Sequence, residues 1–381
     1  MALSVIRWIL LIPAVGGSVF SLLCLWAVFR FRRRKSAGAV EDWPSVSILK
    51  PVHGLEKDLL ENLQSACRQD YPNFEVVLSV QRRNDPAVPV LETLAREFGP
   101  DRVKVVIEEM QPGTNGKINN MAGALPHARY DILVISDSDV HLPSGYLRRI
   151  VAPLSDPSVG FVCTPYRAAR ATRWFEKMEL LSLNADFMPS VVFAYETGAS
   201  LFCLGASIAV RRDTLKEIGG LESLADYLVE DYEMGRRIVG LGRRGMLVPP
   251  IVDTMVDLQT PAQWWNHQVY WDQNTRAARA IAFFCTVLIR AVPFALLFAL
   301  LRPTDAFGWR TLAAVVAIRL AAAGVIMGWG FGDLEGVRAL PLLPLRDVAG
   351  LGSWMLAFVR RTTTWRGTEF ALTRDGRLVS N

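Results

Sequence analysis

The sequence predicts a mixed α/β domain with a mostly parallel, Rossmann-like sheet, carried between transmembrane helices at its two ends. Strand-like and helix-like segments alternate through the middle of the chain, and apolar runs long enough to cross a bilayer lie near both ends. One buried strand also ends in two carboxylates, Asp137 and Asp139. The expected regions are an N-terminal anchor with its basic flank at 1–35, the α/β domain at 45–256, an interfacial helix at 257–280 and a C-terminal membrane region at 281–381.

The N-terminal run from Trp8 to Phe29 holds about 22 almost wholly apolar residues, enough to cross a hydrocarbon core of roughly 30 Å. A cluster of basic residues follows it at once, whereas a cleavable signal peptide carries its charge before a shorter apolar core. We therefore expect a retained anchor whose C-terminal side faces the cytoplasm. The basic residues are Arg30, Arg32, Arg33, Arg34 and Lys35.

The α/β region is interpreted from its hydrophobic periodicity and its turn residues. Strand–helix–strand repetition of this kind favours parallel strands joined by right-handed crossovers. In order, the expected elements are strand 45–50, helix 55–67, strand 74–80, helix 88–98, strand 103–107, a glycine-bearing turn into a helix at 113–120, strand 131–139, strand 159–164, helix 174–187, strand 202–210 and a helix start at 227–237.

The paired carboxylates Asp137 and Asp139 stand at the end of an apolar run, where ligands of open α/β sheets gather. Two carboxylates separated by one residue can both turn toward a hard cation while a phosphorylated substrate supplies further oxygens. An isolated pair of this kind is more often a solvated strand end. The remaining motifs are needed to choose between the two interpretations.

The amino-acid composition argues against several classes of protein. Hydrophobic residues make up 51% of the 381 residues, which is high for a soluble enzyme. The net charge is +5, but basic residues cluster at membrane boundaries and form no stripe on the α/β domain, so we expect no nucleic-acid partner. The five cysteines are dispersed, which argues against a disulfide framework or a structural zinc site.

The C-terminal third is again typical of membrane segments. Residues 281–301 and 311–331 are each long enough to span, and each carries one interior arginine, Arg290 or Arg319. Because intramembrane arginines are costly, each is expected to face a polar cavity, a partner or a headgroup. A third run, 340–359, is interrupted by proline and charged residues, and its status as a span is left open.

Four motifs in one order resemble the ceramide glucosyltransferase family, glycosyltransferase family 21, whose members are membrane-anchored inverting enzymes of the GT-A fold. The resemblance covers roughly residues 45–280 together with the membrane anchors. The motifs are Asp85-Pro86, Gly116-Lys117-Ile118-Asn119-Asn120, Asp137-Ser138-Asp139 and Glu230-Asp231-Tyr232.

The resemblance implies a role for each motif. Asp85 corresponds to an aspartate that helps hold the nucleotide, and Lys117 to a residue that contacts the donor diphosphate. Asp137 and Asp139 correspond to the pair that serves the diphosphate through Mg²⁺ or Mn²⁺. Asp231 corresponds to the general base, although at a helix start a carboxylate is also explained by the helix dipole.

The implied reaction moves glucose or N-acetylglucosamine from a UDP-sugar to a hydroxyl of a lipid acceptor. The acceptor is expected to be ceramide or, for bacterial relatives in hopanoid biosynthesis, a hopanoid, and residues 183–187 and 272–276 favour that branch. We expect an integral protein of a bacterial inner membrane with its catalytic domain in the cytoplasm. Gly205 and Ser207 would line the donor–acceptor junction or simply pack in the core.

One segment departs from the family pattern. The family carries (Gln/Arg)-x-x-Arg-Trp after the base, whereas this chain has His267, Tyr270 and Trp271 at the defining positions. A cation is therefore missing, and Arg276 or Arg279 is the hypothetical substitute. Two alternatives stay open: a processive polysaccharide synthase, which usually keeps that motif and has more spans, and a non-catalytic binding protein for a sugar nucleotide or a lipid.

Overall fold

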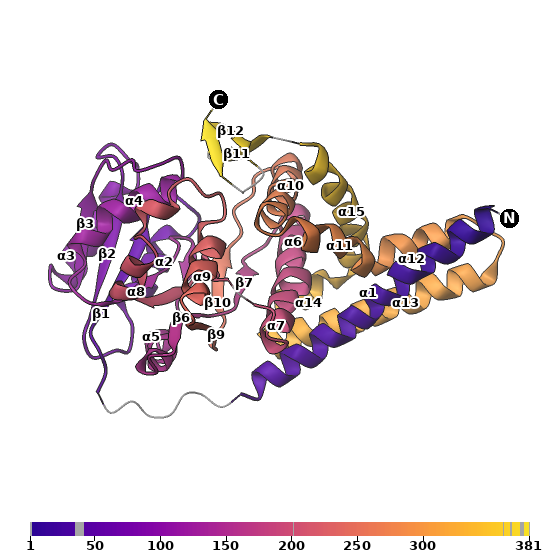
Figure 1. Cartoon of the computed structure of the whole chain (residues 1–381), viewed down its shortest axis with the longest axis horizontal. Helices are drawn as coiled ribbons and strands as arrows, with labels where there is room; N and C mark the ends of the chain where they lie inside the picture. The colour runs from indigo at the N-terminus through magenta and orange to yellow at the C-terminus, as the bar shows by residue number, and fades with distance from the viewer. Residues whose placement is uncertain are drawn as a thin grey trace. The chain divides into compact units, whose positions relative to one another are not determined.

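The computed structural model describes residues 2–34, 42–200, 202–360, 362–365, 368–373 and 377–380, and the chain divides into two compact units (Figure 1). The sheet unit comprises Lys35–Arg167, Ser200–Asp257 and Phe370–Asn381. The helical unit comprises Met1–Arg34, Ala168–Ala199 and Leu258–Glu369.

A seven-stranded, mostly parallel sheet forms the centre of the sheet unit, which confirms the predicted fold class. Every residue of the two strands β1 and β2 is buried. Strands covered on both faces carry near-continuous apolar runs, which is why these sequences lack a strict alternation, and their few polar residues, Ser47, Lys50, Glu75 and Ser79, are buried as well. The order is β3 (Val103–Ile107), β2 (Phe74–Val80), β1 (Val46–Pro51), β4 (Ile132–Ile135), β8 (Ile208–Arg211), β6 (Val159–Cys163) and β9 (Arg244–Leu247).

The strands on the β3 side of the sheet are parallel to one another, and only β8 runs against its neighbours β4 and β6. The carboxyl ends of β1, β2 and β4 therefore meet at one edge. The helices of this unit are α2 (Leu59–Cys67), α3 (Val88–Phe98), α4 (Gly116–Ala124), α5 (Tyr146–Val151), α8 (Arg212–Glu217) and α9 (Glu230–Gly240).

Two small sheets complete the strands. One has the order β5 (Val140–His141), β10 (Val252–Met255), β7 (Tyr166–Ala169), and the other has the order β11 (Thr362–Trp365), β12 (Thr368–Leu372), β13 (Leu378–Ser380). β5 pairs with β10 directly after the Asp137–Asp139 motif. This pairing fixes the chain on the far side of the motif.

Two predicted elements of the sheet unit are shorter than expected. The strand predicted at 202–210 begins only at Ile208, because the residues before it form a turn in which the Gly205 amide hydrogen-bonds to Asp231 instead of a neighbouring strand. The helix predicted from residue 55 begins at Leu59, after Asp58 adopts a left-handed conformation with φ 57°.

The helical unit contains residues 168–199, which were expected to belong to a continuous 45–256 domain. Leu181 and Ala185 from this segment pack with Ala323, Met327 and Leu343 from the C-terminal helices. The elements of the segment are α6 (Trp174–Ser182), a π-helical turn η3 (Leu183–Phe187) and α7 (Met188–Glu196).

The other elements of the helical unit include the predicted interfacial helix, here α10 (Pro261–Ala278), followed by the C-terminal helices. In Figure 1 α1, α12 and α13 run side by side, and these three helices contact one another pairwise. The elements are α1 (Ala2–Arg32), α11 (Ala280–Cys285), η5 (Thr286–Ile289), α12 (Ala291–Leu300), α13 (Ala306–Val325), η6 (Ile326–Phe331), α14 (Leu334–Ala339), η7 (Leu340–Leu342) and α15 (Leu343–Val359).

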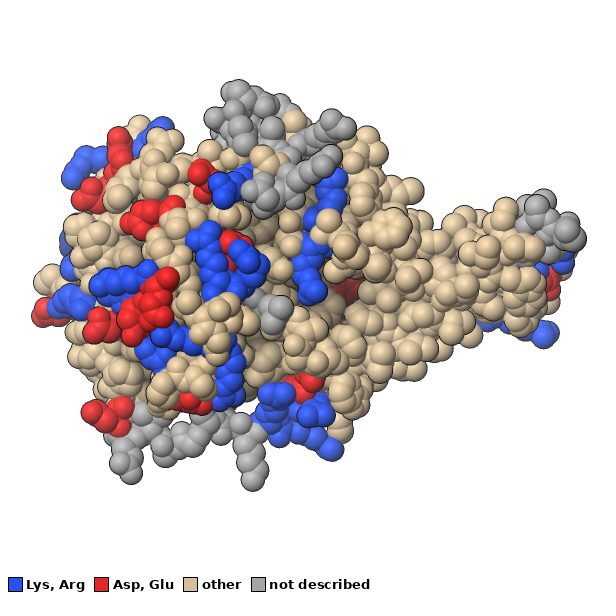
Figure 2. All heavy atoms as spheres, viewed as in Figure 1, with Lys and Arg blue, Asp and Glu red and all other residues tan. Residues whose placement is uncertain are grey.

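Three helical stretches among the described residues are long and apolar enough to cross a membrane: Val5–Arg32, Ala306–Phe331 and Leu334–Val359. The first two agree with the predicted spans, and the third includes the run that was left open. The predicted span 281–301 differs, because it is broken into two helices bent by 50° around Arg290. On the face shown in Figure 2, the surface of α1, α12 and α13 between their ends is uncharged.

Candidate active site

The carboxyl ends of β1 and β4 place Lys50 beneath the Asp137–Asp139 motif. The Lys50 side chain is wholly buried, and its Nζ donates to the carbonyl oxygens of Asp137 at 2.7 Å and Val140 at 2.8 Å. Burial lowers the pKa of Lys50 to about 8, against the opposing effect of the two nearby carboxylates. Lys50 thus fixes the backbone from which Asp137 and Asp139 project.

Lys117 joins α4 to the carboxylates. Its Nζ lies 2.6 Å from Asp137 Oδ1 and 3.3 Å from Glu230 Oε1, and it also donates to the Gly205 carbonyl at 3.3 Å. Burial opposes its charge, but the carboxylates of Asp137 and Glu230 prevail and raise the pKa of Lys117. The side chain does not extend into solvent from the helix start; it bridges two acidic motifs far apart in sequence.

Asp231 stands at the first turn of α9 with both carboxylate oxygens bound. Its Oδ2 accepts a hydrogen bond from the Gly205 amide at 2.7 Å, and its Oδ1 accepts one from the Tyr232 amide at 2.7 Å. Burial and then the adjacent Glu230 carboxylate raise the pKa of Asp231 to about 7. A carboxylate whose pKa is raised to this value can accept a proton near neutral pH.

Asp139 is fixed by Thr254 of β10, whose hydroxyl donates to Asp139 Oδ2 at 2.8 Å. Burial, and then the proximity of Asp137, raise the pKa of Asp139. Burial and then the carboxylates of Asp231, Asp137 and Asp139 raise the pKa of the Tyr166 hydroxyl. Lys117 contacts both Asp137 and the Gly205 carbonyl, and the Gly205 amide donates to Asp231. Asp137, Asp139 and Asp231 therefore converge on one place.

The residues present fit a divalent cation whose coordination is completed by substrate and water. The Asp137 carboxylate contributes to the raised pKa of Asp139, so the pair would gain from a shared positive charge, and the Lys117 ammonium already lies against Asp137. Across the described residues, no group of three or more His, Cys, Asp or Glu side chains could hold a metal ion alone. Such an ion would depend on oxygens from the donor.

Asp85 follows β2 and binds the loop that follows β1. Its carboxylate accepts hydrogen bonds from the amides of Gly54, at 3.0 and 3.1 Å, and Ala87, at 2.9 Å, and His53 Nδ1 lies 3.6 Å away. The loop also carries Glu56, which accepts a hydrogen bond from the Ser138 hydroxyl within the aspartate motif. Asp85 thus orders a loop that contacts the candidate metal-binding segment.

Several contributors were missed in the sequence interpretation. Lys50 was given no role of its own, although a lysine within a largely apolar strand that is buried on both faces signals a buried functional contact. Glu230 was grouped with Asp231 without a role of its own, and Thr254 carries no motif. Ser207, a candidate for the junction, instead hydrogen-bonds Tyr146 and Thr164 in the core, each at 2.8 Å.

The segment that departs from the family pattern lies on α10 in the helical unit. His267 Nδ1 is 2.8 Å from Glu179 Oε1, and the Tyr270 ring stacks on the His267 ring with centroids 6.1 Å apart. The Arg276 guanidinium lies 6.0 Å from the centre of the Phe358 ring. The substitution by Arg276 or Arg279 stays a prediction.

The chain is similar in sequence and in fold to known glycosyltransferases. The sequence profile described as "Glycosyl transferase family 21" matches residues 7–378. Ceramide glucosyltransferase 1 of Caenorhabditis elegans is 29% identical over 204 residues, covering 52% of this chain and 43% of that protein. Ceramide glucosyltransferase of Komagataella phaffii is 35% identical over 130 residues, covering 33% and 26%.

The matched segments span about a quarter to a half of these relatives' own length. Among solved structures, a mannosyltransferase from Pyrobaculum calidifontis, in complex with GDP-Man and Mn²⁺, has a TM-score of 0.56 and 22% identity. It covers 93% of this chain and 99% of that one. At this identity the likeness concerns the fold, which is the GT-A glycosyltransferase fold.

Proposed function

The chain belongs to glycosyltransferase family 21, and from this premise we propose that it is a membrane-bound inverting glycosyltransferase. It moves glucose or N-acetylglucosamine from a UDP-sugar to a hydroxyl of a lipid acceptor, either ceramide or a hopanoid. The ceramide glucosyltransferases among its relatives support the lipid as acceptor.

The observation that carries the proposal is the position of Asp231. Its carboxylate is held by two backbone amides beside the Lys117–Asp137 ion pair, with a pKa near neutrality. A general base requires a fixed orientation and a proton affinity matched to the working pH. Asp231 has both, next to the residues suited to a diphosphate.

In the proposed reaction, Asp231 takes the proton from the acceptor hydroxyl as that oxygen attacks the anomeric carbon of the donor sugar. The new bond joins the acceptor oxygen to the anomeric carbon, and the bond from that carbon to the diphosphate oxygen breaks. UDP leaves with the bonding electron pair, and the proton remains on Asp231. A single displacement of this kind inverts the anomeric configuration.

The remaining candidates bind and orient the donor. Asp85 would help hold the nucleotide through the loop that it orders. Asp137 and Asp139 would hold a divalent cation, Mg²⁺ or Mn²⁺, which when bound neutralises charge on the departing diphosphate. Lys117 would contact the same diphosphate, exchanging part of its interaction with Asp137 for the donor oxygens.

The proposed location is a bacterial inner membrane, with the sheet unit on the cytoplasmic side. The basic end of α1, where Arg30, Arg32, Arg33 and Arg34 are exposed, supports this orientation. The donor would then come from the cytoplasm and the acceptor from the bilayer.

The test is a transfer assay with the full chain in membranes. UDP-glucose and UDP-N-acetylglucosamine are each supplied with ceramide or a hopanoid polyol, in the presence of Mg²⁺ or Mn²⁺. Asp231→Asn should abolish the labelled lipid product, whereas Asp131→Asn should retain it. Asp131 stands at the opposite end of β4, where its side chain is exposed and pairs only loosely with Arg212 at 3.7 Å.

A labelled lipid that requires Asp231 would identify donor and acceptor together. Full activity of Asp231→Asn would remove Asp231 from the role of base. Absence of transfer with every donor–acceptor pair, by intact protein, would contradict the proposed substrates.

A further inference from the structure

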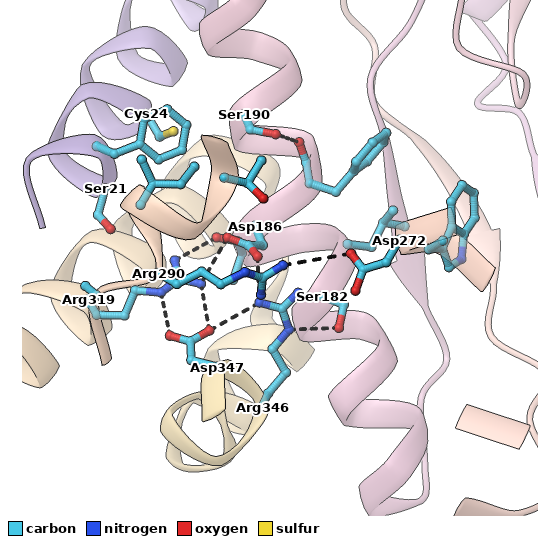
Figure 3. A pocket seen from close by; sticks show the side chains of 18 of the residues that line it. Ser21, Cys24, Ser182, Asp186, Ser190, Asp272, Arg290, Arg319, Arg346 and Asp347 are labelled. Carbon is cyan, nitrogen blue, oxygen red and sulfur yellow. Dashed lines mark hydrogen bonds and ion pairs between the residues drawn. The ribbon is translucent and has the colours of Figure 1, made fainter. Parts of the chain in front are cut away.

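A pocket of about 200 Å³ lies inside the helical unit and plays no part in the proposed proton transfer (Figure 3). A single water needs roughly 10–15 Å³ on the same scale, so this space exceeds what a few waters would fill. Its walls combine charged side chains with aromatic ones, including Phe20, Phe187, Trp271 and Phe283.

Two arginines of the pocket are fully engaged in ion pairs. Arg319 donates to both carboxylate oxygens of Asp347, at 2.9 and 3.2 Å, and to the Ala185 carbonyl at 2.9 Å. Arg346 donates to Asp186 at 2.6 Å and to the Ser182 hydroxyl at 2.9 Å. These contacts satisfy the charges that they bring into the bundle.

Arg290 is different. It points into the same pocket, with a side chain only 16% exposed, but its one ion pair is a long contact of 3.8 Å to Asp272. Its Nε is buried with no hydrogen-bond partner among the described residues. A buried guanidinium donor is costly to leave unmet, so the pocket presents a binding group rather than a finished structural network.

The pocket also lies at mid-length of the candidate membrane helices. Arg319 is the fourteenth of 26 residues in Ala306–Phe331, and Arg346 is the thirteenth of 26 in Leu334–Val359. Arg290 occupies the bend between Ala280–Ile289 and Ala291–Leu300. Broken helices and interior charges at this depth are tolerated where they line a cavity, and they mark binding sites in membrane proteins.

We propose that this pocket binds the uncharged, hydroxyl-bearing headgroup of one membrane lipid. Arg290 would donate hydrogen bonds to the headgroup oxygens, and Asp272 would accept from its hydroxyls. The aromatic walls would contact the adjoining apolar part of the lipid. That this lipid is the sugar acceptor rests on the proposed function; the binding itself does not.

The balance of charged side chains in the pocket favours a neutral headgroup over a phosphate. The three arginines of the pocket are balanced by three aspartates, Asp186, Asp272 and Asp347. Glu179 adds a further carboxylate, which accepts a hydrogen bond from Gln268 at 2.6 Å. No excess of positive charge is left to compensate a buried phosphate, whereas hydroxyl and amide groups need none.

The test measures lipid binding directly, without donor or turnover. Purified full-length protein in detergent is titrated with radiolabelled short-chain ceramide and short-chain diacylglycerol as neutral probes. Phosphatidic acid of the same chain length serves as the anionic probe. The neutral probes should bind, and phosphatidic acid should bind at least about ten-fold more weakly.

Two variants test lipid binding in the pocket, one by removing a hydrogen-bond donor and the other by reducing the space available. Arg290→Gln removes the unmet charged donor and should weaken binding of the neutral probes roughly ten-fold or more. Thr275→Trp narrows the pocket from an exposed lining position and should weaken it similarly without touching the ion pairs. Thr275→Ala and Arg310→Gln, the latter at an exposed site near the start of α13, are matched controls that should bind as wild type.

Wild-type affinity in both Arg290→Gln and Thr275→Trp would overturn the proposal, as would preferential, Arg290-dependent binding of phosphatidic acid. Asp231→Asn separates the two hypotheses, because it should bind the neutral probes normally while losing transfer. If the pocket variants lose lipid binding but no donor–acceptor pair supports sugar transfer, the proposed function is contradicted and the lipid-binding proposal is supported. If sugar transfer depends on Asp231 but Arg290→Gln and Thr275→Trp bind lipid as wild type does, only the lipid-binding proposal is contradicted.

Discussion

Asp231 is surrounded by groups that act on its proton in opposite directions. Burial and the Glu230 carboxylate raise the pKa of Asp231 to about 7, while Lys117 and two backbone amides favour its charged form. A base must be deprotonated to act, so activity is lost as pH falls through the pKa of the free enzyme. We expect kcat/KM to fall about ten-fold per pH unit below roughly pH 7, measured as transfer rates at limiting substrate.

Glu230→Gln provides the control for this pH dependence. Removing the neighbouring charge lowers the pKa of Asp231, so the acid limb of the profile should move to lower pH. An acid limb that stays in place in this variant would show that another group titrates.

Gly205 supplies a second prediction, because its backbone touches two of the candidate site residues. A Cβ at this position would lie 3.0 Å from Asp231 Oδ2 and 3.3 Å from Lys117 Nζ, so one of them must shift. Gly205→Ala should lower kcat by roughly ten- to a hundred-fold, because small displacements of a base are costly to the rate. Thermal unfolding should change little.

The matched control is Gly240→Ala at the end of α9, where a Cβ meets nothing within 4 Å. It should leave the rate within about two-fold of wild type. Equal rates for Gly205→Ala and wild type would show that the Asp231 position tolerates displacement.

At this scale the sequence predicted some residues and not others. Asp137 and Asp139 could be singled out because two carboxylates at the end of a buried strand suggest chemistry, whereas Asp231 was identified only through the resemblance to the family. The contacts of Lys50 and Gly205 could not, since they depend on β1 pairing with β4 and on a turn where a strand was expected. Their roles exist only once distant segments meet.

At the scale of elements, the prediction succeeded where one hydrophobic period dominates and missed the break where a charged residue interrupts an apolar run. The buried strands β1 and β2 and the helix α3 lie within a residue of their expected bounds. The apolar run 281–301 looked like one span, but the chain bends at Arg290, which lies in the pocket. Hydropathy counts apolar residues and does not detect a charge that turns inward.

The pair of helices α13 and α15 allows a prediction about stability. Asp347 faces both Arg319 and Arg346, and Arg319 and Asp347 are each about 10% exposed. Asp347→Asn removes a negative charge that pairs with the buried guanidinium groups of Arg319 and Arg346. The free energy of unfolding should therefore fall by about 3–5 kcal/mol. Unfolding in detergent, followed by circular dichroism, measures this change.

The double variant Arg319→Met with Asp347→Leu tests the physical reason. Replacing a buried ion pair by apolar groups is often nearly neutral, so the double variant should be more stable than Asp347→Asn alone. Additive losses in the double variant would mean that the pair contributes nothing as a pair.

At the scale of the whole molecule, the chain is less continuous than its sequence suggested. The strand–helix alternation favoured one domain over 45–256, but residues 168–199 fold with the C-terminal helices. Their apolar positions do not distinguish a core helix of a sheet domain from a helix of a bundle. The charged partner of Asp186 lies more than a hundred residues further along, in Arg319 and Arg346.

The orientation of the helical unit gives the last prediction. Arg7 near the start of α1 is hydrogen-bonded to Asp305, in the turn between α12 and α13, so both lie at the end of the bundle opposite Arg32. If Arg32 faces the cytoplasm, that turn faces away from it. In a Cys285→Ser background, Thr304→Cys should react with a membrane-impermeant maleimide only from the non-cytoplasmic side.

Ser155→Cys, at an exposed position of the sheet unit, is the counterpart and should react only from the cytoplasmic side. The other four native cysteines are buried and should stay silent. Labelling of both engineered sites from one side would contradict the proposed topology.

The ion pair between Arg319 and Asp347 also bears on how the protein is made. An arginine at the centre of a lone helix raises the cost of insertion by roughly 2.5–3.5 kcal/mol, so a nascent chain ending after η6 would present a poorly accepted segment to the insertion machinery. Asp347 follows only 28 residues after Arg319 and binds it at 2.9 Å. Arg319 therefore gains its Asp347 partner only after α15 has been synthesised, whereas Asp186 and the Ala185 carbonyl are already present. We expect α13 to reach its final packing only once α15 is in place.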